Sequence, residues 1–170
     1  LTDFGDWNGS GAATATTSSN RNINLRLGAT VDAETSVTPN AAASADDTTN
    51  TGSADDEDGV TMPSTINQGL VVTIPVTVTN STASAAYLHA WMDLNNDGTF
   101  NNTLVTSGGE RLEAARVITA SSGTTTQNVT FTVPGSSSIG ANRGVRFRVS
   151  DSATTAPTTS GGWGEIEDYV

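Results

Sequence analysis

Oxygen-bearing side chains at alternate positions between residues 93 and 99 give this sequence its clearest chemical signal. Asp93, Asn95 and Asp97 are two residues apart, and Gly98 follows them. Ca²⁺ binds six to eight oxygen ligands, and a tight loop with acids and amides at odd positions points several oxygens inward. Thr99 can add its backbone carbonyl. We therefore predict a calcium site here, with a solvated Asn-Asp-Gly hairpin turn as the alternative.

The surroundings of this loop exclude a helical EF-hand. That motif needs a glutamate at its twelfth position, and the twelfth position here is Leu104. The loop instead follows a strand-like segment, as in non-helical variants of the pattern. Glu110 lies farther along the chain, and we expect it to fold back as a bidentate calcium ligand.

Two further groups of acids suggest a second cation site. One is the run at residues 55–58, and the other is the segment 164–169. Adjacent acids repel one another in a folded chain unless a cation lies among them. The alternative is a solvated acidic loop. We expect the ligands of this second site to be Asp55, Asp56, Asp58, Glu165 and Asp168.

The charge balance indicates cations as partners. The chain has 18 acidic residues against 7 basic ones, all of them arginine, and its net charge is −11. Binding to phosphates needs clustered lysine and arginine, so nucleic acid and anionic membranes are disfavoured as partners. Cysteine is absent, and no apolar run is long enough to insert into a membrane. We expect residues 1–170 to form one domain, excised from a larger protein.

Short alternating segments must position these loops. Residues 70–79 place valine and isoleucine on one face and threonine on the other, which is the pattern of a half-buried strand. Turn residues separate this segment from others like it, and such spacing favours an antiparallel β-sandwich. The predicted fold is therefore all-β, an antiparallel β-sandwich with long calcium-binding loops. We predict strands at residues 21–30, 70–79, 86–93, 112–119, 124–133 and 143–150.

The same alternation predicts which side chains face solvent. Pro75 lacks an N–H, so its strand should be at an edge or bulged. His89 is expected on an exposed or lightly packed face, with a catalytic base as the minority interpretation. Val117 is expected to be the main apolar residue of its short strand. Arg146 and Arg148 are expected to form a solvated face that pairs with nearby acids.

Taken in order, the acidic motifs resemble the bacterial GEVED domain family, which is named for a terminal Gly-Glu-Val-Glu-Asp signature. The chain has GEIEDYV at 164–170, with Ile166 in place of the valine. The resemblance implies a β-sandwich accessory domain of large extracellular bacterial proteins, including adhesins and multidomain surface or secreted enzymes. It implies no catalytic activity. It also covers DFGD at 3–6, LRLGATVDAE at 25–34, DDEDGV at 55–60, AYLHAWMDLNNDGTF at 86–100, FTVP at 131–134 and VRFRVS at 145–150.

Three functions remain open at this level. The first is a calcium-stabilised structural or spacer module, which touches neighbouring domains of a secreted or cell-surface protein. The second is a calcium-dependent module of an adhesin that binds a peptide or glycan, with the segment 40–58 as a wall of the site. The third is an enzyme such as a glycosidase, which would need one acid with a raised pKa beside an ionised one. We expect no enzyme, because the acids lie in polar, turn-rich segments.

Overall fold

The computed structural model describes residues 2–9, 14–16, 24–31, 38–45, 57–138, 140 and 143–170. In these residues the fold is all-β, and η2, at Val105–Ser107, is a short 3-10 turn. None of the described segments forms a helix of the length and hydropathy that crossing a bilayer requires. The strands are β1 (Thr2–Phe4), β2 (Thr14–Thr16), β3 (Leu25–Leu27), β4 (Val71–Asn80), β5 (Ala86–Met92), β6 (Arg111–Ile118), β7 (Gly123–Thr132), β8 (Val145–Ser150) and β9 (Ser160–Tyr169).

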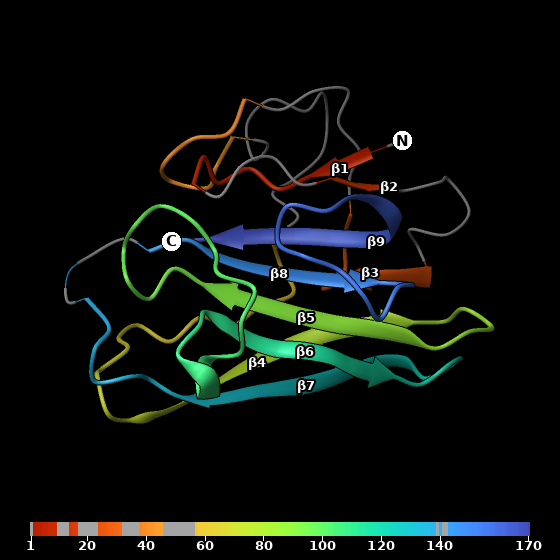
Figure 1. Ribbon diagram of the computed structural model, residues 1–170. Coiled ribbons are helices and arrows are strands. Elements are labelled where there is room, and N and C mark those ends of the chain that lie inside the picture. Colours follow the sequence, from red (N-terminus) through yellow and green to blue (C-terminus); the bar gives the residue numbers. More distant parts are fainter. Residues whose placement is uncertain are drawn as a thin grey trace.

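The strands form two sheets. One has the order β1-β2-β9-β8-β5-β6, and the other has the order β3-β4-β7. Figure 1 shows β9, β8, β5 and β6 side by side in one layer. The paired strands are antiparallel except β2 and β9, which run parallel. The predicted two-sheet, all-β fold is therefore confirmed, with one parallel pair that the sequence did not indicate.

The core lies between the sheets and follows the predicted alternation. On β4, the residues at positions 72, 74, 76 and 78 are buried, and they alternate with exposed or half-buried neighbours. Leu88 on β5, Phe131 on β7 and Phe147 on β8 join them in one apolar cluster. Removing this surface from water is the main stabilising contribution to such a fold, about 25 cal/mol per Å².

Pro75 corrects the expectation of an edge or bulged strand, because β4 is the central strand of its sheet and its pairing with β7 has no register shift. On the other side, β3 pairs only with the last residues of β4, from Val78 to Asn80. The carbonyl of Pro75 accepts the N–H of Thr61 at 3.0 Å, so the backbone of Pro75 points away from β7. Since the missing N–H points to a side that β3 does not reach, no pairing with a named strand is lost there.

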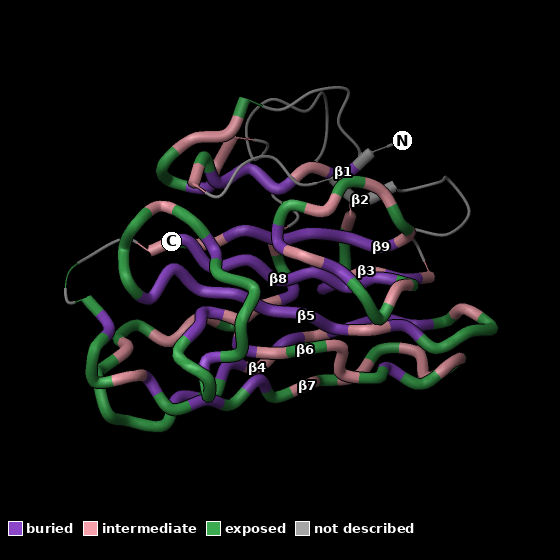
Figure 2. Tube along the Cα trace, in the orientation of Figure 1, coloured by how far each residue is buried: buried purple, intermediate pink, exposed green. Residues whose placement is uncertain are grey.

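The outer face of the large sheet corrects one group of predictions. His89, Arg146 and Arg148 are 0–1 % exposed, not solvated. The segments at 3–8 and 38–45 cover part of this face, where Trp7 packs with residues 43, 91 and 100 in a second apolar cluster, and the segment 152–161 contacts His89 and Arg148. Figure 2 shows β8, nearly all of β5 and the second half of β9 as buried. A local alternation pattern cannot reveal such a cover, because the cover comes from distant residues.

A second correction concerns β6. Val117 is 61 % exposed, whereas Leu112 and Ile118 are buried. The pairing of β6 with β5 shifts register twice, and Ala115 has a left-handed backbone with φ 58°. Irregularities of this kind change which side chains face the core, so Leu112 and Ile118, and not Val117, are the main buried apolar residues of β6.

Candidate metal site and acidic junction

The loop after β5 is shaped by Asp93. This residue is 1 % exposed, and its Oδ1 accepts the N–H of Asp97 at 3.1 Å while its Oδ2 accepts the N–H of Gly98 at 3.0 Å. Gly98 has φ 80°, a left-handed conformation that favours glycine. The chain therefore reverses at the predicted position, and the reversal brings Asp97 back beside Asp93.

Glu110 folds back onto this loop, as predicted. Its carbonyl accepts the N–H of Met92 at 3.0 Å, which places its side chain directly beside Asp93. The carboxylate is 3 % exposed. Its Oε1 accepts the N–H groups of Leu94 and Asn95 at 2.8 and 3.0 Å, and its Oε2 accepts an N–H from residue 101 at 2.8 Å. Both oxygens thus help to hold the loop in its curved form.

Asp93, Asp97 and Glu110 offer three carboxylate oxygens that lie within 4.8 Å of one another. Calcium binds oxygen at about 2.3–2.6 Å, so two ligands on opposite sides of one ion are up to about 5.2 Å apart. The spacing therefore fits a single shared ion. Asp93 and Glu110 are buried and Asp97 is exposed, so a cation can enter from the side of Asp97. In the described part of the chain, no other group of three or more acids or histidines meets this criterion.

Asn95 and Thr99, the other two predicted ligands of this loop, both contact Asp97. The Nδ2 of Asn95 donates to Asp97 Oδ2 at 3.0 Å, and Thr99 donates to Asp97 Oδ1 from its N–H at 2.8 Å and its Oγ1 at 2.6 Å. Hydrogen bonds first from Thr99 and then from Asn95 lower the pKa of Asp97. Asp97 is therefore held in its charged form.

The acids predicted for a second cation site have separate partners. Asp58 is exposed and accepts the N–H of Ala29 at 2.8 Å. Glu165 is buried and accepts the N–H of Leu27. Asp55 and Asp56 lie outside the described residues, so their part of the prediction is not placed. The structure gathers the described members of this set into no three-acid group, and this second site stays a prediction.

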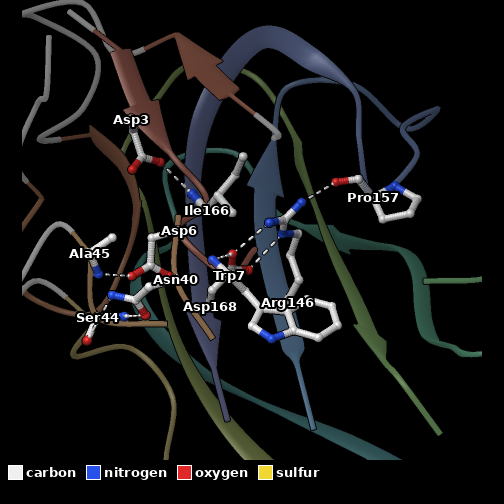
Figure 3. Close-up of polar contacts among 10 residues, drawn as sticks. All are labelled: Asp3, Asp6, Trp7, Asn40, Ser44, Ala45, Arg146, Pro157, Ile166 and Asp168. Atoms are coloured by element: carbon white, nitrogen blue, oxygen red, sulfur yellow. Dashed lines mark hydrogen bonds and ion pairs between the residues drawn. The ribbon is translucent and has the colours of Figure 1, made fainter. Parts of the chain in front are cut away.

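Asp168 instead pairs with Arg146 in a buried junction. Arg146 donates from Nε to Oδ1 at 2.7 Å and from Nη2 to Oδ2 at 2.6 Å, and both side chains are 0 % exposed. Asp168 also accepts the N–H of Trp7 at 2.9 Å, while Arg146 donates to the carbonyl of Pro157 at 2.7 Å (Figure 3). Burial alone would lower the pKa of Arg146, but the negative charges of Asp168, Asp6 and Asp3 outweigh it and raise that pKa.

The first acidic motif attaches two chain segments to this junction. Asp3 accepts the N–H of Ile166 at 2.6 Å, and Asp6 accepts the N–H of Ala45 at 2.6 Å (Figure 3). The carbonyl of Asp6 also accepts the N–H of Asn40 at 2.8 Å. These carboxylates thus accept hydrogen bonds from the backbone N–H groups of distant, irregular segments. In a longer strand, a neighbouring strand would accept those bonds.

The terminal acids follow the same rule. Glu167 accepts the N–H of Gly59 and the hydroxyl of Tyr169, both at 2.9 Å. Together with Glu165 and Asp168, it takes backbone N–H groups from segments more than 100 residues away. Sequence reasoning missed this role. The only sequence signal for this role has two parts. The terminal strand is rich in acids, and the first third of the chain is poor in regular strands.

His89 is bonded on both sides of its ring. Nδ1 accepts from Arg111 Nη2 at 2.7 Å and from the N–H of Ala115 at 3.3 Å, so Nε2 donates to the carbonyl of Ser152 at 3.1 Å. Burial, with the neighbouring positive charges of Arg111 and Arg148, lowers its pKa to about 4. His89 is therefore a neutral, structural residue at pH 7.

A family model, the GEVED domain, matches the part of the chain that carries both sites. The match spans residues 87–170, from β5 to the terminal motif. Residues 87–170 belong to the GEVED domain family. The expected resemblance is thus confirmed for this half of the chain. Searches of curated proteins and of solved structures give no match.

The boundaries of the GEVED match cut through the fold. The matched half contains the Asp93–Glu110 loop and the Arg146–Asp168 pair. However, β4 lies before it and supplies four of the fully or nearly buried core positions, at 72, 74, 76 and 78. The GEVED half therefore shares its core with the preceding residues. GEVED domains are in general extracellular accessory domains of larger proteins.

Proposed function

We propose that the chain is a non-catalytic, calcium-binding module of a large bacterial secreted or cell-surface protein, with a structural or spacer role. The observation that carries the proposal is the grouping of Asp93, Asp97 and Glu110 within 4.8 Å. Two of these carboxylates are buried without an ion-pair partner in the described residues. The family supports an accessory role, and calcium is the cation that extracellular modules meet at the required concentration.

The mechanism of the proposed module is linkage. An ion that binds the folded loop, and not the unfolded chain, stabilises the fold by RT ln(1 + [Ca²⁺]/Kd). Extracellular modules bind calcium with Kd values of about 10⁻⁴–10⁻³ M. At 10 mM calcium the stabilisation is then about 1.4–2.7 kcal/mol. For a chain of this size that raises Tm by about 3 to 11 °C.

Thermal unfolding in 10 mM calcium and in EDTA tests the proposal. The wild type should melt higher in calcium, and Asp97→Asn should lose most of this difference because it removes one charged ligand. Asp151→Asn is the matched control, since Asp151 is also exposed and also accepts a backbone N–H, from Trp163 at 3.0 Å. It should keep the full calcium effect. Equal melting of the wild type in calcium and in EDTA would refute the proposal.

Magnesium gives a second control on the identity of the ion. Mg²⁺ demands a near-octahedral site at about 2.0–2.1 Å and keeps several of its waters. The three carboxylate oxygens lie within 4.8 Å of one another, which suits the wider coordination shell of calcium, so we expect magnesium to raise Tm by less than half as much as calcium. Equal effects of the two ions would indicate charge screening and not a site.

A further inference from the structure

A pocket of about 520 Å³ lies at the end of the sandwich, beside the Asp93–Glu110 loop. Its apolar lining comes from core residues: Met92 and Val145 at paired positions of β5 and β8, Leu94 from the loop after β5, and Val133 just after β7. The segment at residues 62–68 forms another wall. Sites for small ligands are typically concave, mostly apolar and about 300–1,000 Å³ in volume. This pocket has the size and lining of a binding site.

The polar groups of the pocket converge on one side. Arg143 is its only charged residue among the described lining residues, in a chain whose net charge is −11. Its Nη1 donates to the carbonyls of Asp93 and Leu94 at 3.2 Å each, and its Nη2 donates to Ser138. A guanidinium has five N–H donors, so these bonds fix the orientation of Arg143 and leave donors for a ligand.

Ser137 is a second polar group of the pocket that is available to a ligand. Its side chain is 8 % exposed and lines the pocket, yet its Oγ has no hydrogen-bond partner among the described residues. A buried hydroxyl without a partner costs about 1–3 kcal/mol. An incoming acceptor removes that cost, and a carboxylate is the acceptor that also matches Arg143.

We propose that this pocket binds the carboxyl-terminal residue of a partner polypeptide, with its free α-carboxylate at Arg143 and Ser137 and an aliphatic side chain on the apolar lining. The charge complementarity selects a carboxylate, and the lining selects a side chain such as leucine. This proposal does not depend on the calcium proposal, because the pocket is formed by protein atoms alone.

NMR titration of the whole chain with acetyl-Gly-Gly-Leu, and with the same peptide as its carboxyl-terminal amide, tests the proposal. We expect shift changes at Met92, Val133 and Val145, and a Kd at least tenfold lower for the acid than for the amide. Arg143→Gln removes the charge and should abolish the preference for the acid. The matched control is Arg116→Gln, at a partly exposed arginine on β6, which should keep that preference.

Ser137→Ala is a second variant, and the small substitution at an unpartnered hydroxyl should leave folding intact. It should weaken binding of the acid about three- to tenfold. Equal affinity for acid and amide, shift changes elsewhere, or an unchanged preference in Arg143→Gln would overturn the proposal. The two proposals fail separately, because Asp97→Asn tests the calcium effect on Tm and Arg143→Gln tests the preference for the acid.

Discussion

The Asp93–Glu110 loop and the Arg146–Asp168 junction are both built on buried carboxylates, but the charge of these carboxylates is compensated differently. In the junction, the protein supplies its own cation, a guanidinium that bonds both oxygens of Asp168 within 2.7 Å. In the loop, Asp93 and Glu110 receive only backbone N–H groups, and no described basic side chain forms an ion pair with either. Amide dipoles orient these acids without cancelling their charge.

The difference teaches what each site needs to stay folded. A buried charge is costly unless an opposite charge or a metal ion compensates it. The junction is complete as it stands, so its stability should not depend on the solvent ions. The loop keeps its geometry, but in the described part of the chain neither Asp93 nor Glu110 has an ion-pair partner, so its stability should follow the concentration of a divalent cation.

Breaking the junction should have the largest effect. Arg146→Gln leaves Asp168 buried without a counter-charge, and we expect a loss of about 3–5 kcal/mol in the free energy of unfolding. That corresponds to a fall in Tm of about 6–20 °C. Urea unfolding in EDTA measures the loss, and calcium should not restore it.

The control for this variant is Arg116→Gln. Arg116 pairs with Glu113 at 2.5 Å, but its side chain is 34 % exposed. Exposed pairs contribute about 0–1 kcal/mol. If both variants lost the same stability, or if calcium rescued Arg146→Gln, the contrast between the two regions would be wrong.

Acid titration should distinguish the contribution of His89 to stability from the contributions of the loop and the junction. Its pKa is about 4 in the folded protein, against an ordinary histidine value of 6.5, so the unfolded chain takes up the proton first as the pH falls. Stability should therefore be unaffected above pH 6.5 and fall by about 3 kcal/mol between pH 6.5 and 4. Urea unfolding at half-unit pH steps measures this slope in the presence of EDTA.

His89→Asn should flatten most of that slope above pH 5, where carboxylates still contribute little. The variant keeps an acceptor for Arg111 and a donor for Ser152, although it should be less stable at pH 7. A slope identical to the wild type's would assign the acid sensitivity to other groups. The loop and the junction should therefore be compared above pH 6.5, where His89 is neutral in both the folded and the unfolded chain.

Removing the third acid of the loop should have an intermediate effect. Glu110→Gln can still accept the N–H groups of Leu94 and Asn95 but loses the charge. We expect it to lose most of the 1.4–2.7 kcal/mol that about 10 mM calcium contributes, and to bind calcium at least tenfold more weakly by calorimetry. Calcium affinity equal to the wild type's would show that Glu110 only shapes the loop.

What the sequence could predict depends on the distance between partners. The strand β4 and the return of Glu110 to Asp93 are local, since alternation and hairpin pairing operate over fewer than 20 residues. The amide bonds of the three terminal acids come instead from Trp7, Leu27 and Gly59, each more than 100 residues from the acid that it bonds. Nothing in a local pattern distinguishes an acid that binds a cation from one that accepts a backbone N–H.

The smallest expected effect tests how the loop uses Thr99. Thr99→Val removes the Oγ1 donor to Asp97 but keeps the backbone carbonyl that we assign to calcium. We expect a loss of about 0.5–1.5 kcal/mol in EDTA, the usual net contribution of one hydrogen bond, and less in calcium because the ion then holds Asp97. Calorimetry should find a calcium Kd within threefold of the wild type's. A larger loss of affinity would mean that the hydroxyl, not the carbonyl, is the ligand, and that the loop depends on side chains as fully as the junction does.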